Sequence, residues 1–358
     1  MRDLLLAARH EANGAVFREE AGWQVPARYG PVPAEVASVR TRAGLADLGD
    51  RAKIEVRGED RVTFLDGLVT ADVKALRTDM SVYALLLTDR SRVVGDLRLV
   101  ALGDRFVLDI EAGQAGIVLA YMEKFLVSDD VSFVDRGPSD HIELHGPAAP
   151  RILSAALGKD LDTLPVGASV SFETGPGAVA FATCLRTYGE PGFAVWTPGA
   201  TLGPLWDALR AAGAAPVGRE ALEVLRIEAG IPRVGQDMGG DTLALEVAPA
   251  GAISFTKGCY VGQEIVARGT YRGHVNRKLF GLRIEGDDPP DRGDPVRKGE
   301  VDVGRVTSAA WSPSLGHAIG LALLRVGEVD REMPILVDRG GTVLPARVHP
   351  LPFVRGSA

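Results

Sequence analysis

The chain has 358 residues, of which 46 % are apolar and 24 % charged, with a formal net charge of −7. This length is too great for one ordinary core, so we expect a soluble globular protein of two or three domains. The negative charge argues against direct nucleic-acid binding, and no apolar run approaches the length of a membrane span.

The N-terminus and the cysteines limit location and cofactor chemistry. The opening MRDLLLAARHEANG becomes charged too early for a signal peptide, which favours the cytoplasm. Two cysteines, Cys184 and Cys259, cannot form a disulfide framework or a zinc site made only of cysteine. A metal held by Cys259 would therefore need ligands from elsewhere.

The elements predicted before residue 137 suggest a compact two-layer α+β unit. In chain order they are a strand at 52–58, a helix at 59–73, a three-stranded meander within 81–112 and a helix at 115–126.

The rest of the chain reads as a further α+β stretch followed by a small barrel. A helix at 201–213 ends on Gly213, and short strands with glycine-rich turns follow the polar loop at 285–295. We therefore predict an α+β fold of three domains. These comprise residues 1–50 together with 138–270, residues 51–137, and residues 275–358.

Two polar patterns have ordinary explanations. The alternation in HIELH indicates a strand, which holds His141 and His145 roughly 13 Å apart, too far for one ion to bridge. Arg226 and Glu228 end an amphipathic segment that leads to Asp237, and surface ion pairs are the default expectation for them.

Asp96 is a stronger candidate because it follows Gly95 within a run typical of a buried strand. A glycine inside a strand often marks the close approach of a ligand or of another backbone. A carboxylate at such a place could bind an amine-rich heterocycle or hold a proton with a raised pKa. The alternative is that Asp96 points to solvent on the alternating face.

The segment FTKGCYVGQEIVAR suggests a reactive thiol. We expect a helix from Tyr260 to Arg268, stopped by Gly269, with Cys259 at its N-terminus and Lys257 nearby. A helix N-terminus and a cation both favour a thiolate, and Gly258 and Gly262 would leave the sulfur open. Alternatively, the glycines serve tight turns and the cysteine is a small apolar residue.

The motif KGCYVGQE resembles the signature of the YgfZ-type proteins. The matching positions are Lys257, Gly258, Cys259, Tyr260, Val261, Gly262, Gln263 and Glu264. This resemblance implies folate binding and a role in iron–sulfur cluster assembly or repair, and through it in tRNA modification.

Most of the chain is also similar to the glycine cleavage T-protein superfamily of tetrahydrofolate-dependent aminomethyltransferases. Segments in the same order include AGWQVPARYG, FLDGLVTADV, VVGDLRLV, LRIEAGIPRVGQDM and PFVRG. The resemblance implies a three-part fold with a central folate cavity and a C-terminal β-barrel. It assigns Asp96 to the reacting folate nitrogens, Tyr83 and Tyr188 to the pocket wall, Arg226 to the cofactor, and Arg355 to a substrate contact.

Departures from the T-protein pattern fall on folate chemistry. Where the T-protein has GYTGEDGFEL, whose second glutamate holds the pterin ring, this chain has YGEPGFAV, with Ala194 at that position. Losing a bidentate carboxylate would cost a few kcal/mol of binding. Glu190 is a candidate replacement. Ala71 stands where the T-protein has an asparagine.

Three functions follow from these resemblances. The first is a cytoplasmic tetrahydrofolate-binding protein that supports iron–sulfur assembly, with Cys259 as its working thiol, by sharing a transient cluster with a partner or client protein or by persulfide exchange. The second is a folate-dependent aminomethyl- or methyltransferase that uses Asp96. The third is a folate-binding scaffold without catalysis.

Overall fold

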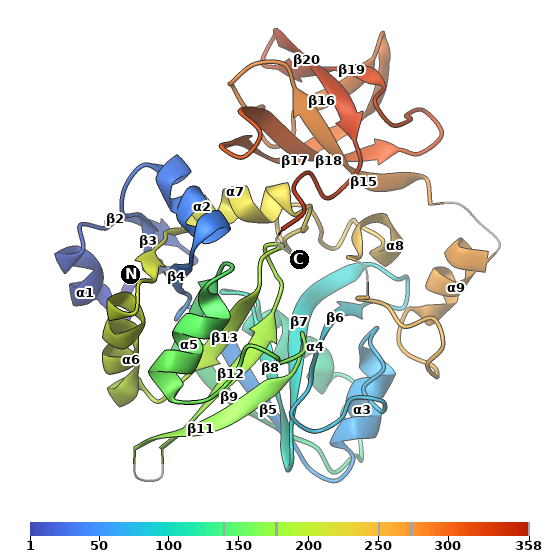
Figure 1. Ribbon diagram of the computed structural model, residues 1–358. Coiled ribbons are helices and arrows are strands. Elements are labelled where there is room, and N and C mark those ends of the chain that lie inside the picture. The colour runs from blue at the N-terminus through green and yellow to red at the C-terminus, as the bar shows by residue number, and fades with distance from the viewer. Residues whose placement is uncertain (139, 176–177, 250, 272–274, 357–358) are drawn as a thin grey trace.

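The computed structural model describes residues 1–138, 140–175, 178–249, 251–271 and 275–356 (Figure 1). Two β-sheets with helices on their outer sides form the body, and a barrel formed by the last strands sits above them. No helix within these ranges is long and apolar enough to cross a membrane.

A five-stranded sheet forms one half of the body, with strand order β6-β7-β8-β5-β9. Its strands are β5 (Ala52–Arg57), β6 (Ser81–Leu87), β7 (Val93–Leu102), β8 (Arg105–Ile110) and β9 (Ser132–Pro138). The three-stranded meander predicted from the sequence is therefore confirmed as β6, β7 and β8. The predicted helices are α3 (Arg61–Leu68) and α4 (Ala115–Glu123), and they pack on one face of this sheet.

A six-stranded sheet forms the other half, with strand order β11-β12-β13-β10-β4-β14. Its strands are β4 (Gly44–Asp47), β10 (His141–His145), β11 (Ser169–Gly175), β12 (Ala178–Leu185), β13 (Gly192–Trp196) and β14 (Ala215–Pro216). Helices α5 (Ala149–Leu157) and α6 (Gly199–Ala211) cover its outer face, where Ile142, Leu144 and Trp206 share one core cluster. The other face of the sheet is turned toward the five-stranded sheet.

The N-terminal residues form a small sheet beside this body. It contains β1 (Arg2–Asp3), β2 (Val16–Glu20) and β3 (Trp23–Arg28), and α1 (Ala7–Ala12) precedes β2. Helices α2 (Val32–Thr41) and α7 (Arg219–Glu228) pack together against β4 through Val36, Val39 and Leu225. Helix α7 then lies directly beneath the barrel (Figure 1).

The C-terminal part is a closed barrel of six strands, as the sequence predicts. Its strands are β15 (Arg277–Ile284), β16 (Pro295–Lys298), β17 (Val301–Ser312), β18 (His317–Arg325), β19 (Pro334–Arg339) and β20 (Thr342–His349). After β20 the chain returns beneath the barrel, where the backbone N–H groups of Phe353 and Val354 donate to the Glu228 carbonyl. The fold agrees with the three-part α+β architecture expected from the sequence.

The helix expected at residues 260–268 is present but begins and ends three residues later. Helix α8 (Ala244–Val247) precedes the cysteine, and α9 runs from Gln263 to Tyr271. Cys259 therefore lies four residues before the helix, and Gly269 lies within it instead of stopping it. The local reason is a cap: Gln263 Oε1 accepts a hydrogen bond from the Tyr260 backbone N–H at 3.1 Å, which holds the preceding residues in a turn.

Candidate functional site

Tyr83 and Asp96 form a hydrogen-bonded pair on the inner face of the five-stranded sheet. Tyr83 Oη donates to Asp96 Oδ2 at 2.8 Å. Tyr83 lies opposite Arg98 and Asp96 lies opposite Leu85, so the tyrosine reaches the carboxylate diagonally across the two strands. Both side chains are half-buried. The alternative that Asp96 points freely to solvent is therefore wrong.

The surroundings place the pKa of Asp96 close to neutral pH. Burial, followed by the charge of Glu111, raises the pKa of this carboxyl to about 6, while the Tyr83 hydrogen bond and Arg51 act in the opposite direction. A group with such a pKa can both accept and release a proton under physiological conditions.

Gly95 serves helix packing and not the approach of a ligand. A Cβ at this position would lie 3.1 Å from Val118 Cγ2 of α4, on the face of the sheet opposite to Asp96. The glycine that first drew attention to Asp96 thus has a structural cause. The case for Asp96 depends on its contact with Tyr83 and on its pKa.

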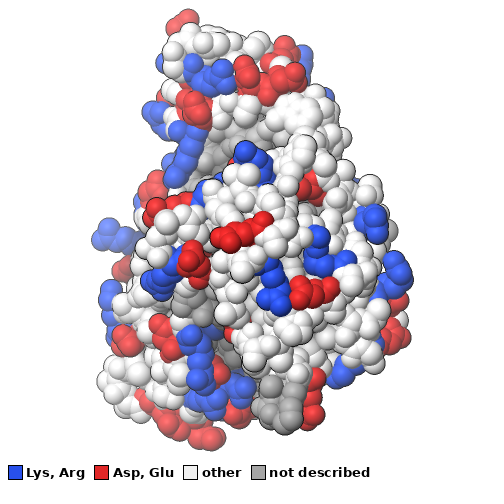
Figure 2. All heavy atoms as spheres, turned by 90° about the vertical axis from the view of Figure 1, so that its left-hand side faces the viewer, with Lys and Arg blue, Asp and Glu red and all other residues white. Residues whose placement is uncertain are grey.

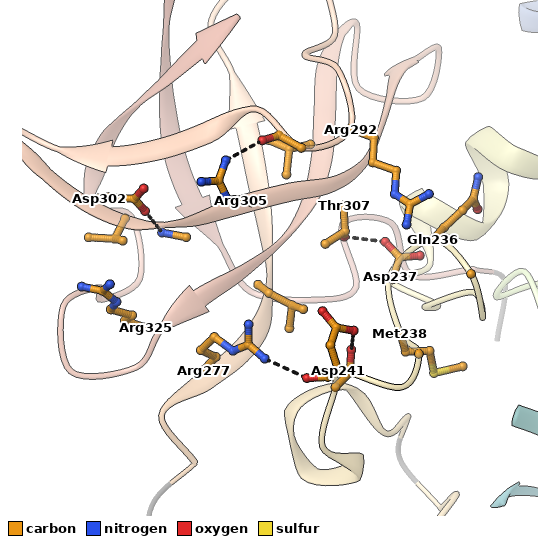
Figure 3. Close-up of a pocket in the computed structure, with 18 residues that line it drawn as sticks. Gln236, Asp237, Met238, Asp241, Arg277, Arg292, Asp302, Arg305, Thr307 and Arg325 are labelled. Carbon is orange, nitrogen blue, oxygen red and sulfur yellow. Dashed lines mark hydrogen bonds between the residues drawn. The ribbon is translucent and has the colours of Figure 1, made fainter. Parts of the chain in front are cut away.

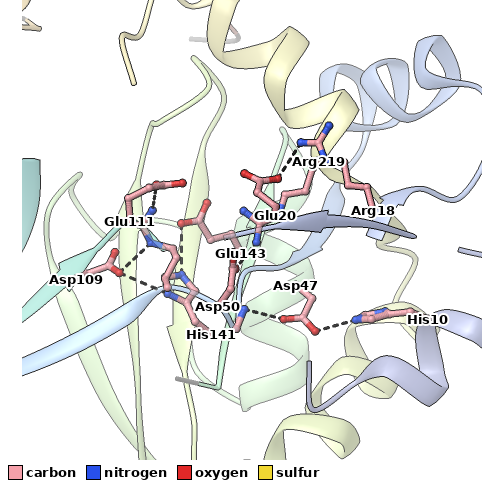
Figure 4. Close-up of polar contacts among 12 residues, drawn as sticks. His10, Arg18, Glu20, Asp47, Asp50, Asp109, Glu111, His141, Glu143 and Arg219 are labelled. Atoms are coloured by element: carbon pink, nitrogen blue, oxygen red, sulfur yellow. Dashed lines mark hydrogen bonds and ion pairs between the residues drawn. The ribbon is translucent and has the colours of Figure 1, made fainter. Parts of the chain in front are cut away.

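A network of buried charges lies between the two sheets (Figure 4). Arg51 contacts Asp109 at 2.9 Å and Glu111 at 2.5 Å, and Lys53 Nζ donates to Asp109 at 2.6 Å. Burial lowers the pKa of Lys53 to about 8, although Asp109 opposes the shift. Burial alone would raise the pKa of Asp109, but Arg51 and Lys53 hold it well below its usual range.

The facing wall is formed by β10 and by the loop before β13. His145 Nε2 lies 2.8 Å from Glu143 Oε2, and the Tyr188 ring stands edge-on to the His145 ring at 4.6 Å. Burial and the charges of Glu143 and Glu111 raise the pKa of Tyr188. Since Glu111 acts on both Asp96 and Tyr188, the predicted pocket residues from the two sheets border the same charged region.

The two residues linked to the pterin-holding position have different surroundings. Ala194 lies in β13, directly opposite Glu143 of β10. Glu190 is buried, and its Oε1 accepts a hydrogen bond from Arg40 Nη1 at 2.9 Å. Arg40 also pairs with Glu228, so Glu190 belongs to an ion-paired cluster at the end of α7.

Arg226 joins α7 to the barrel. It donates to the side chains of Glu223, Asp237, Gln236 and Ser308 and to the Ile231 carbonyl. Its partner Asp237 also accepts from Ser308 Oγ at 2.7 Å. The expectation of a surface ion pair is therefore wrong, because Arg226, Glu228 and Asp237 are all buried. The predicted cofactor contact of Arg226 would have to replace bonds that it already makes.

Arg355 lies in the C-terminal segment that packs below the barrel, and its side chain is exposed. The neighbouring Gly356 touches the 188–190 turn so closely that a Cβ there would lie 2.0 Å from the Gly189 carbonyl oxygen. The segment thus approaches the turn that carries Tyr188. A substrate contact by Arg355 stays a prediction.

Lys257 has a structural role in the cysteine motif. Its ammonium donates to the carbonyls of Asp66, Val69 and Ala71 at 2.6–3.0 Å and lies 3.0 Å from Asp66 Oδ1. These carbonyls surround the C-terminal end of α3, where a cation is favoured. The side chain is only 1 % exposed. The ammonium is thus bound at the end of α3, and an effect of its charge on the Cys259 thiol stays a prediction.

One of the two glycines of the motif has a packing explanation. Gly262 has φ +85°, and a Cβ there would lie 2.6 Å from the Thr88 carbonyl oxygen, so this glycine permits close packing on the β6–β7 turn. Gly258 has no neighbour among the described residues within 4 Å of its Cβ position.

The other residues of the motif differ in exposure. Cys259 is exposed, Tyr260 is buried against the sheet, and Glu264 pairs with Arg268 on the exposed side of α9. Cys184 is buried, and burial raises its thiol pKa.

A pocket of about 550 Å³ lies away from Asp96, between the 235–242 loop and the barrel (Figure 3). Its lining includes Arg277, Arg292, Arg305 and Arg325, together with Asp237, Asp241 and Asp302. Arg277 is bound to Glu246, and Asp237 is bound to Arg226. The lining does not include Tyr83, Asp96 or Tyr188, so the predicted folate cavity is not this pocket.

Charged side chains of both signs are interspersed over the face of the molecule shown in Figure 2. That face has no extended basic surface of the kind that binds nucleic acid. The buried charged groups that the sequence did not single out are Arg51, Glu111 and Glu143. Glu143 lies in the alternating strand β10, whereas Arg51 directly precedes β5 and Glu111 directly follows β8.

Comparisons with known proteins match the whole architecture. Residues 6–257 match the GCVT N-terminal domain, and residues 277–355 match the glycine cleavage T-protein C-terminal barrel domain. The chain is 34 % identical to an aminomethyltransferase of Rubrobacter xylanophilus, across 99 % of this chain and 95 % of that one. It is 32 % identical to an aminomethyltransferase of Saccharopolyspora erythraea, across 98 % and 97 %.

A solved structure shows the same likeness in three dimensions. The crystal structure of glycine cleavage system aminomethyltransferase T from Bartonella henselae superposes with a TM-score of 0.90 at 28 % identity. The match covers 99 % of this chain and 98 % of that chain.

Proposed function

Because the chain belongs to the glycine cleavage T-protein superfamily, we propose that it is a tetrahydrofolate-dependent transferase. It would transfer the one-carbon unit of an aminomethyl group to tetrahydrofolate. The relatives described above are named aminomethyltransferases, and this supports the proposal. Among the functions inferred from the sequence, it is the one that uses Asp96.

The observation that carries the proposal is the Tyr83–Asp96 pair. In the formation of methylene-tetrahydrofolate, two folate nitrogens each bond to the methylene carbon and each lose a proton, while the lipoyl sulfur and the amine leave that carbon and each take a proton up. Asp96, with a pKa of about 6, is mostly ionised at neutral pH and can receive one of the folate protons. Tyr83 fixes the orientation of the carboxylate through its 2.8 Å hydrogen bond.

The residues around Asp96 fit a reduced folate. Aromatic rings at Tyr83 and Tyr188 offer faces and edges to a flat heterocycle. Arg51 and Glu111 surround the carboxylate with a paired and therefore immobile set of charges, which is the kind of preorganised environment that favours proton transfer.

Iron–sulfur assembly is not part of the proposal. None of the relatives described above carries a name connected with it. The lysine and one glycine of the cysteine motif have structural partners, and only the exposure of Cys259 remains in favour of a working thiol. An exposed cysteine alone does not indicate a cluster site.

The test supplies tetrahydrofolate and an aminomethylated lipoyl carrier protein and follows the formation of methylene-tetrahydrofolate. We expect turnover within the ordinary range for enzymes, on the order of 1–1,000 per second. Calorimetry with 5-formyltetrahydrofolate measures binding separately. A protein that binds the folate but transfers nothing would support the scaffold function instead, and the absence of heat at millimolar ligand would exclude both.

A further inference from the structure

Strand β10 directs three ionisable side chains into the space between the two sheets. His141, Glu143 and His145 alternate with Ile142 and Leu144, which lie in the core on the opposite face. From the five-stranded sheet, Lys53 Nζ lies 2.9 Å from His141 Nδ1. Lys53 also binds Asp109. Glu143 therefore lies beside a network of buried charges, and two members of that network, Arg51 and Glu111, act on the pKa of Asp96.

The neighbours of Glu143 on this face are small. In the sheet register it lies opposite Ala46 of β4 on one side and Ala194 of β13 on the other. Directly opposite residues share a face of the sheet, with Cβ atoms roughly 5 Å apart. The Glu143 carboxylate is therefore flanked by two methyl groups, and Ala46 and Ala194 are both buried.

The hydrogen bonds of this cluster are incomplete within the described part of the chain. Glu143 Oε2 contacts His145 Nε2 at 2.8 Å, whereas Oε1 lies 3.4 Å from His141 Nε2. His141 is fully buried, and its Nε2 has no hydrogen bond among the described residues. Because the Lys53 ammonium donates to Nδ1, the proton of a neutral His141 ring is on Nε2. A buried donor thus lies beside a carboxylate oxygen that can accept another bond.

We infer that Glu143 and His141 bind the edge of the pterin ring of the folate, with Glu143 accepting from a ring N–H and His141 donating to the neighbouring carbonyl. This inference depends on the proposed function. A pterin presents a carbonyl next to an N–H, and that pattern is complementary to the unpaired His141 donor and to Glu143 Oε1. The carboxylate absent at position 194 is thereby supplied by the adjacent strand.

Glu190, the replacement considered from the sequence, is a weaker candidate. Its carboxylate forms an ion pair with Arg40 at 2.9 Å, and Arg40 also binds Glu228 and the Tyr188 carbonyl. This cluster joins α2, α7 and the turn before β13. Glu190 therefore offers a matched control, because it is a buried carboxylate whose partner is an arginine of the protein.

The experiment measures calorimetric affinity for 5-formyltetrahydrofolate in the full chain. Glu143→Gln should weaken binding by about 10- to 100-fold, the loss expected for a hydrogen bond to a charged acceptor. Glu190→Gln should bind within about twofold of wild type. The double variant Glu143→Ala/Ala194→Glu, which moves the carboxylate to the opposite strand, should recover most of the affinity. p-Aminobenzoylglutamate, which has no pterin, should inhibit transfer by wild type and by Glu143→Gln equally.

The outcomes separate the two proposals. Wild-type transfer activity together with unchanged folate affinity in Glu143→Gln would overturn this inference and leave the proposed function standing. Wild-type protein that binds no folate would overturn both. If Glu143→Gln does not fold, Glu143→Asp decides, because it keeps the charge and shortens the side chain: a folded variant that binds 10-fold more weakly or worse supports the inference, and one with wild-type affinity refutes it.

Discussion

The Tyr83–Asp96 pair and the cysteine loop, residues 255–264, both contain distinctive residues, but the side chains of the two regions have different bonding partners. In the pair, the carboxylate accepts one hydrogen bond from a neutral tyrosine and has no cation bound to it in the described structure. In the loop, the lysine is bound to a helix end and a glycine lies against a backbone carbonyl. A distinctive sequence motif therefore does not by itself identify chemistry, and the partners of each side chain do.

The two regions are nevertheless adjacent. Tyr260 and Val266 share a buried cluster with Leu85 and Leu87 of β6, and Tyr83 packs at its edge. The loop therefore covers the same sheet face that carries Asp96. Its distinctive composition can be understood as support for the wall of the site, and the predictions below test that division of roles.

The largest expected effect is on Asp96. Asp96→Asn keeps the shape of the side chain but removes the proton acceptor, so we expect kcat to fall by about 100- to 10,000-fold. The methylene-tetrahydrofolate assay measures this, with the exposed residue Asp287 as control, where Asp287→Asn should leave kcat unchanged. Activity of Asp96→Asn within fivefold of wild type would remove Asp96 from the chemistry.

The second effect concerns stability. Lys257→Met removes the buried cation from three carbonyls at the end of α3 and from the Asp66 carboxylate, which keeps the exposed Lys74 at 3.6 Å. Breaking such a buried pair costs about 3–5 kcal/mol, which urea unfolding would measure. Lys298 is exposed, and among the described residues it donates to the Glu328 carbonyl alone, so Lys298→Met should change stability by less than about 0.5 kcal/mol. Equal stability of the two variants would contradict the structural role of Lys257.

The third effect is a shift in pH dependence. Transfer needs ionised Asp96, so activity should fall as the pH drops through its pKa of about 6. The Tyr83 hydrogen bond lowers that pKa, and Tyr83→Phe should therefore move the acidic limb upward, by about one pH unit. Tyr121→Phe removes a hydroxyl bound to the Leu87 carbonyl and should leave the limb in place. A limb that moves downward in Tyr83→Phe would show that the tyrosine does not stabilise the ionised form.

The sequence predicted the fold better than the site, for a physical reason. Alternation and turn residues are local, and they located the meander β6–β8, strand β10 and the barrel. Partners depend on tertiary contacts: nothing near Lys257 in the chain indicates that it binds carbonyls 186–191 residues away. In the same way, the pairing of Glu143 with Ala194 depends on strand register. Asp96 could be proposed from its neighbours, although the glycine that supported it packs against α4.

The smallest expected effect is at Cys259. It tests whether the cysteine loop has only a structural role, in contrast to the Tyr83–Asp96 pair. Its sulfur is exposed while that of Cys184 is buried, so iodoacetamide should label the folded protein at Cys259 and reach Cys184 only on unfolding. If the loop only supports the wall of the site, Cys259→Ser should keep its stability within about 0.5 kcal/mol and its transfer activity within about twofold. Cys184→Ser places a hydroxyl in an apolar core and should lower stability by about 1–3 kcal/mol. If Cys259→Ser folds normally and binds folate but loses all activity, the thiol takes part in the chemistry, and the iron–sulfur hypothesis becomes the better account of the loop.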